Sequence, residues 1–229
     1  MEKKLYPTTE SEMKELTLYQ QKYLSLAELF LWAEGLDFTE WILGTRTRWK
    51  RTEYTLPRLV RNKKLRAVRH GKRLVYTASK KASTQHIEHG LACTRALLRF
   101  KKSKQGVYIA ESYFKQHGYK SIPEWGIVYP NGTLLFEYTT ADNFRRVKAM
   151  NRKVDVYRKE LKKFQGVFDK PFYLFVIEAP RYEVKRFAEK LDGHFYAVDA
   201  SSFFDVTKKE QLTTPIYIWG GDGQTYPLD

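Results

Sequence analysis

Three glutamates stand at the ends of three apolar runs in the second half of the chain, where they could hold a divalent metal ion. Glu111 follows the first run, Glu124 opens the second and Glu137 ends the third. The turn Pro130-Asn131-Gly132 joins the last two runs into a hairpin, so Glu124 and Glu137 should lie near the same end. Neighbouring carboxylates repel unless a hard cation such as Mg²⁺ neutralises them, and that ion polarises phosphodiesters and activates water. The alternative is that these acids simply end strands at the surface.

A second group of residues is suited to binding phosphate. Residues 44–81 carry 14 Lys and Arg against one acid, Glu53, a net of +13 in a chain whose total is +15. Charge this concentrated attracts phosphates and releases their counterions, which favours double-stranded DNA as the partner over a merely solvated basic face. The candidate contacts are Arg46, Arg48, Lys50, Arg51, Arg58 and Arg61, with Lys72 and Arg73 in a following hairpin.

Four predicted elements over residues 8–81 would position these cations. They are a helix from about Thr8 to Gly35, a short helix capped by Asp37 or Thr39 and closed by Gly44, a third helix within 47–62, and a β-hairpin over 65–77. The hairpin is indicated by alternating apolar and basic residues around His70-Gly71. This order predicts a winged helix-turn-helix domain, whose third helix enters the major groove while the hairpin touches the DNA backbone or minor groove.

The second predicted domain, residues 84–229, alternates helices and strands. The helices are expected at 84–100, 142–164 and 181–191, and the strands at 107–110, 125–129, 133–138, 172–177, 194–198 and 216–219. The order α-β-β-β-α-β-α-β is that of a restriction-endonuclease-like core. The expected fold class is therefore α/β (α+β overall), with a winged helix ahead of a nuclease-like domain.

Composition places the chain among globular intracellular proteins. It has 229 residues, 42% of them apolar, and no apolar run long enough to span a membrane. The N-terminus lacks a secretory h-region, and Cys93 is the only cysteine, in an apolar helical setting that suggests a buried free thiol. These features predict a cytoplasmic protein with no membrane partner.

With these motifs the chain resembles the replication-relaxation proteins of bacterial plasmids and mobile elements, over about residues 24 to 180. The residues that carry the resemblance are the wing exit 73–79, the run His89-Gly90-Leu91-Ala92, the acids Glu111, Glu124 and Glu137, and the pair Lys153 and Tyr157. The resemblance implies a winged helix joined to a restriction-endonuclease-like domain. It also implies catalytic roles for Glu111, Glu124, Glu137 and Lys153, with Mg²⁺ held by Glu124 and Glu137.

Two departures from that family's pattern leave two functions open. Thr139 stands where nucleases of this kind commonly carry a lysine, so Lys153 would have to serve from the next helix, and Glu124 replaces the more usual aspartate. One hypothesis is a Mg²⁺-dependent DNA nickase of plasmid replication or mobilisation. The other is a non-enzymatic origin-binding protein or transcriptional regulator whose nuclease-like domain is degenerate.

Other chemistries have weaker support in the sequence. Tyr157 is the best-placed tyrosine for a nucleophile, although packing is the commoner role of a helical tyrosine. His86 and His89 share a helix face without a closely spaced third histidine, and one cysteine disfavours zinc. RNA binding has no specific sign. Winged-helix proteins often bind DNA as homodimers, but no heptad marks an interface here.

Overall fold

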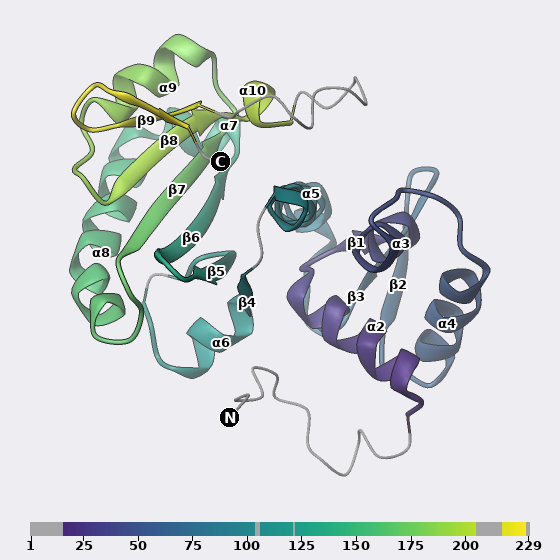
Figure 1. The fold of residues 1–229 in the computed structure, drawn as a ribbon. Coiled ribbons are helices and arrows are strands. Elements are labelled where there is room, and N and C mark those ends of the chain that lie inside the picture. Colours follow the sequence, from purple (N-terminus) through teal and green to yellow (C-terminus); the bar gives the residue numbers. More distant parts are fainter. Residues whose placement is uncertain (1–15, 104–105, 121, 205–216, 228–229) are drawn as a thin grey trace. The chain divides into compact units, whose positions relative to one another are not determined.

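The computed structural model describes residues 16–103, 106–120, 122–204 and 217–227 (Figure 1). These residues form helices and two sheets, which confirms a mixed α and β fold. The chain divides into two compact units, Met1–Lys102 and Ser103–Asp229. Helix α5 (Ile87–Ser103), which we expected to open the second domain, is thereby grouped with the first unit. The predicted helix start near Thr8 lies outside the described residues.

In the described part of the first unit three helices precede a hairpin, in the predicted order, but the first helix, predicted to run to Gly35, ends at Leu29. They are α2 (Leu18–Leu29), α3 (Gly35–Leu43) and α4 (Lys50–Arg61), followed by strands β2 (Arg66–His70) and β3 (Arg73–Thr77). A short strand, β1 (Ala33–Glu34), pairs with β3 and completes a sheet of order β1-β3-β2. A 3₁₀ turn, η1 (Thr84–His86), capped by Ser83, leads into α5.

The ends of these elements follow local chemistry, with one correction. Thr17 and Gln20 form a capping box at the start of α2. Gly44, with φ of 75°, ends α3 as predicted, because glycine adopts the left-handed conformation without steric cost. The prediction that Asp37 or Thr39 caps α3 was wrong. The helix begins at Gly35, and the Asp37 carboxylate reaches back to accept the Glu34 N–H at 2.7 Å.

Close packing around Trp32 holds α5 in the first unit. Trp32 is fully buried with Val75, Ile87 and Leu91. The Thr94 hydroxyl donates to the Trp32 carbonyl at 2.7 Å. A Cβ atom at Gly90 would lie 2.7 Å from the Trp32 ring, so only glycine permits this approach.

The second unit is built on a seven-stranded sheet of order β10-β9-β8-β7-β6-β5-β4 (Figure 1). The strands are β4 (Val107–Ala110), β5 (Trp125–Tyr129), β6 (Gly132–Thr139), β7 (Pro171–Ile177), β8 (Phe195–Asp199), β9 (Tyr217–Gly220) and β10 (Thr225–Pro227). The first three pair antiparallel, and β6, β7 and β8 run parallel to one another. The six predicted strands are thus present to within a residue or so, with Ile216 outside the described residues. Strand β10 was not anticipated.

Helices cover both faces of this sheet. They are α6 (Glu111–Gln116), α7 (Ala141–Arg145), α8 (Val147–Gln165), α9 (Arg181–Ala188) and α10 (Ala200–Phe204). Helices α8 and α9 pack through a shared apolar core against one face, whereas Phe203 of α10 contacts Phe136 on the other. The single helix predicted over 142–164 is interrupted at Arg146, whose ψ of 68° leaves the helical region. The helix predicted over 181–191 ends three residues early, at Ala188. No helix among the described residues is long and apolar enough to cross a bilayer.

Candidate functional sites

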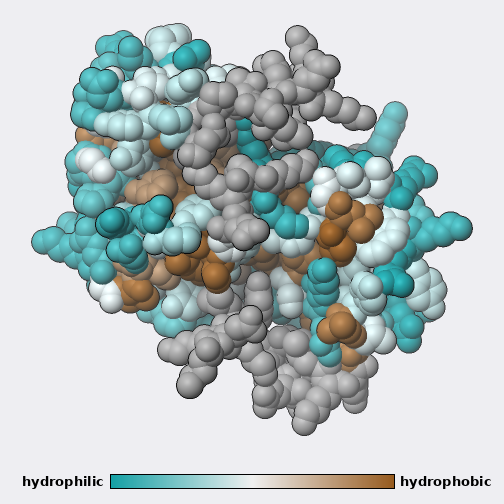
Figure 2. Space-filling model, viewed as in Figure 1, coloured by the Kyte–Doolittle hydropathy of each residue, from teal (hydrophilic) through white to brown (hydrophobic). Residues whose placement is uncertain are grey.

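Helix α4 presents a cationic face to solvent. It buries Thr52, Thr55, Leu56 and Leu59 against the first unit. The opposite face exposes Lys50, Tyr54, Arg58 and Arg61, at spacings of four, four and three residues. Beside them is an open hollow lined by Glu53, Tyr54, Pro57, Arg58, Arg61 and Asn62. Hydrophilic side chains, in teal, project from the right-hand edge of Figure 2, where Figure 1 draws α4 and its neighbours.

Six of the eight predicted DNA contacts are available to a ligand. They are exposed and pair with no acid among the described residues: Arg48, Lys50, Arg51, Arg58, Arg61 and Lys72. The Arg51 guanidinium lies 3.9 Å from the centre of the Tyr19 ring, a contact that steadies the side chain and leaves its charge in place. Lys72 stands at the tip of the β2–β3 hairpin, next to Gly71.

The other two predicted contacts are held by carboxylates within the first unit. Arg46 binds Glu40 at 3.1 Å and Glu34 at 3.3 Å, and also pairs with Asp37. Asp37 is fully buried, and burial raises the pKa of its carboxyl, an effect that the Arg46 charge opposes. Because its donors are committed to these acids, Arg46 serves to stabilise the unit and is poorly placed to bind phosphate.

Arg73 is tied into the same acidic cluster. It pairs with Glu88 of α5 and lies 3.5 Å from Glu34, which also pairs with Arg95 at 3.7 Å. Glu34 thus connects strand β3 to α5 and to the loop before α4. Sequence reasoning missed this role, although Glu34, Asp37 and Glu40 recur every three residues, a spacing that places acids on one side of a short helix.

In the second unit, Glu137 is a buried carboxylate two residues before the end of β6. Only 2% of it is exposed. Lys153 of α8 donates to Oε1, and the Tyr157 hydroxyl, one turn further along α8, donates to Oε2 at 2.5 Å. Tyr157 is positioned by stacking on Tyr173, with ring centres 4.5 Å apart. Both glutamate oxygens therefore have donors from the helix that packs on this face of the sheet.

Burial raises the pKa of the Glu137 carboxyl to about 7, against the lowering effect of Lys153; the nearby Glu124 carboxylate adds to the rise. Burial and the charge of Glu137 also raise the pKa of the Tyr157 hydroxyl well above its ordinary value. Glu124 precedes β5, and its N–H donates to the Phe136 carbonyl at 3.0 Å, so it lies across from Glu137. The structure thus brings Glu124, Glu137 and Lys153 together.

Glu111 and Thr139 contribute differently to this region. Glu111 is the first residue of α6 and forms an ion pair with Lys115 at 2.6 Å, so its charge is neutralised locally. Thr139 is buried two residues beyond Glu137, and its hydroxyl has no hydrogen-bond partner among the described residues. A neutral threonine cannot supply the positive charge of the lysine that the nuclease resemblance led us to expect at this position.

The donor chemistry at Glu124 and Glu137 fits Mg²⁺, which proteins often hold through one or two carboxylates together with substrate phosphates. Glu137 is already bonded by Lys153 and Tyr157, so an ion would have to share or displace those donors. Within either unit taken alone, the described residues bring no three His, Cys, Asp or Glu ligand atoms within 4.8 Å of one another. Neither unit by itself therefore provides an all-protein metal cage among its described residues.

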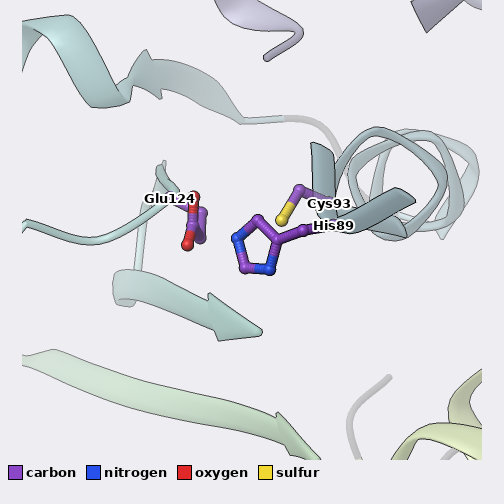
Figure 3. A group of neighbouring side chains, drawn as sticks. All are labelled: His89, Cys93 and Glu124. Carbon is purple, nitrogen blue, oxygen red and sulfur yellow. The ribbon is translucent and has the colours of Figure 1, made fainter. Parts of the chain in front are cut away.

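His89 and Cys93 lie one turn apart on the same side of α5, as Figure 3 shows together with Glu124 of the second unit. Cys93 is a buried free cysteine, as predicted. Imidazole and thiolate are two of the four ligands that a structural zinc site needs. The described part of the first unit provides no third donor beside them.

Comparisons with models of known protein families, with curated proteins and with solved structures gave no match. What the two units can do is therefore inferred from their own side chains.

Proposed function

We propose that the chain binds double-stranded DNA through the first unit, which acts as a winged helix with α4 in the major groove. The observation that carries this proposal is the outward face of α4, where Lys50, Arg58 and Arg61 are exposed without acidic partners among the described residues. An α-helix fits the major groove of B-DNA, where arginine and lysine can reach both phosphates and guanine edges.

The order of elements supports the same proposal. Among the described residues two helices precede α4, a hairpin follows it, and the β1-β3-β2 sheet packs with them, an arrangement typical of winged helix-turn-helix domains. The hairpin carries exposed Arg69 and Lys72, so its tip can meet the DNA backbone beside the groove.

The test is fluorescence anisotropy with a labelled duplex and, as competitors, unlabelled DNA and an RNA duplex. We expect the double variant Arg58→Gln/Arg61→Gln to bind DNA at least tenfold more weakly, because each removes one phosphate or base contact. The matched control is Lys185→Gln/Arg186→Gln, which removes two exposed cations from α9 of the second unit. Equal losses in both variants would contradict the assignment to α4, and stronger competition by RNA would contradict the choice of DNA.

A second candidate function, metal-dependent nicking of the bound DNA, is supported by the group Glu124, Glu137 and Lys153. The strand directions agree with a restriction-endonuclease-like core, since three antiparallel strands precede a parallel one. Glu124 and Glu137 would hold Mg²⁺, which supplies Lewis acidity to the phosphodiester. Lys153, whose side chain is 37% exposed, can turn toward solvent and neutralise charge on a phosphate. Tyr157 is a poor nucleophile because its hydroxyl is buried and donates to Glu137.

A nicking assay separates this function from a purely DNA-binding one. Supercoiled plasmid carrying the DNA that flanks the protein's own gene is incubated with Mg²⁺, Mn²⁺ or EDTA. We expect open circles to form only with metal and to be lost in Glu137→Ala and in Lys153→Met, while the surface control Glu189→Ala keeps the activity. Thermal unfolding of each variant shows whether a loss reflects misfolding. DNA binding by the wild type without conversion would assign the protein to the non-enzymatic class.

A further inference from the structure

We propose that Glu53 is a specificity residue that accepts a hydrogen bond from the amino group of a cytosine in the major groove. The proposal rests on the DNA binding assigned to α4 above. It concerns which sequence is bound, whereas the exposed cations concern how tightly any sequence is bound.

The carboxylate of Glu53 lies where it would weaken binding to DNA phosphates. It is the one acid among residues 44–81, which carry 14 Lys and Arg. It is exposed on α4 and lines the same hollow as Tyr54, Arg58 and Arg61. A carboxylate there repels DNA phosphates and lowers affinity for every sequence alike. A hydrogen bond to a base would offset that repulsion for the sequences that provide it.

Glu53 is also not engaged in the first unit. Its carboxylate pairs with no cation among the described residues, unlike Glu34, Glu40 and Glu88, which hold arginines. Pro57 stands four residues further along the helix, where a cation would pair best with Glu53, and Lys50, three residues before Glu53, forms no ion pair with it among the described residues. An acid in the first turn does suit the positive end of a helix, but that benefit requires no particular DNA sequence.

The chemistry of the hollow matches a G·C pair. In the major groove cytosine presents an amino donor, which glutamate accepts, and guanine presents two acceptors, which arginine binds in a bidentate manner. Glu53 and Arg58 line one hollow, so an acceptor and a donor side chain border the same space. Thymine presents no hydrogen-bond donor in the major groove. Adenine does present an amino donor, but its adjacent N7 acceptor repels a carboxylate.

The experiment is selection of bound duplexes from a library with a randomised central segment, read by sequencing, for the wild type, Glu53→Gln and Lys72→Gln. We expect the wild type to prefer cytosine at one position by about fivefold or more. Glu53→Gln should lose that preference and gain adenine there, because a carboxamide can both donate to and accept from adenine. Lys72→Gln should weaken binding to all sequences and leave the preference unchanged.

Tighter binding of Glu53→Gln to every sequence, with the base preference of the wild type retained, would overturn the proposal and leave DNA binding by α4 intact. A wild type that binds DNA with no base preference would do the same. If the wild type bound no duplex at all, the proposed function itself would fail. Because Glu53 is exposed, its replacement should leave the free energy of unfolding nearly unchanged, which urea unfolding checks.

Discussion

The salt dependence of DNA binding should report how many cations of the first unit contact phosphate. Six predicted contacts are exposed and without acidic partners among the described residues, whereas Arg46 and Arg73 are held by carboxylates. If all six contact phosphates, the logarithm of the binding constant should fall with the logarithm of salt concentration with a slope of about −5. Affinity would then fall about a thousandfold between 50 and 200 mM salt.

Single substitutions measure how much each residue contributes to this slope. Arg61→Gln and Lys72→Gln should each reduce its magnitude by about 1, which corresponds to about an eightfold loss of affinity at 0.1 M salt. The assay is anisotropy with one duplex across a salt series, so that sequence effects are constant.

Arg46→Gln provides the opposite outcome. The slope should stay the same, because the Arg46 guanidinium is committed to Asp37 and Glu40. The free energy of unfolding should instead fall by about 2–3 kcal/mol, since buried Asp37 loses its main partner. A slope reduced by 1 with unchanged stability would refute the division between structural and DNA-contacting arginines.

Two further predictions concern stability. Burial raises the pKa of Glu28 from 4.5 to about 7, so folding favours its protonated form and stability falls as pH rises across that window. Glu28→Gln should remove this pH dependence, and at pH 8 its free energy of unfolding should exceed that of the wild type by about 1–2 kcal/mol, a value reduced for partial exposure. Urea unfolding at pH 5 and pH 8 measures the difference, and identical pH profiles of the two proteins would contradict the prediction. Gly90→Ala should lower stability by about 1–3 kcal/mol because the new methyl would meet Trp32, whereas Gly193→Ala, with open space around it, should have little effect in the same thermal unfolding assay.

Local sequence patterns predicted most of the secondary structure. Alternating apolar and basic residues around Gly71 located the β2–β3 hairpin, and Pro130-Asn131-Gly132 located the turn between β5 and β6. Both depend on neighbours within a few residues, where backbone preference decides conformation. The break at Arg146 was not predictable in this way, because the apolar spacing of the segment continues across it.

The sequence by itself determined where basic residues concentrate and, through the turn at Pro130-Asn131-Gly132, that Glu124 and Glu137 would lie at one end of a hairpin. Tertiary structure decided which charges remain available. Glu34 pairs with Arg73 and Arg95, residues 39 and 61 positions away, and Lys153 reaches Glu137 only because α8 packs across β6. An ion pair depends on distances of a few ångströms, and a sequence specifies those distances only after distant segments have packed together.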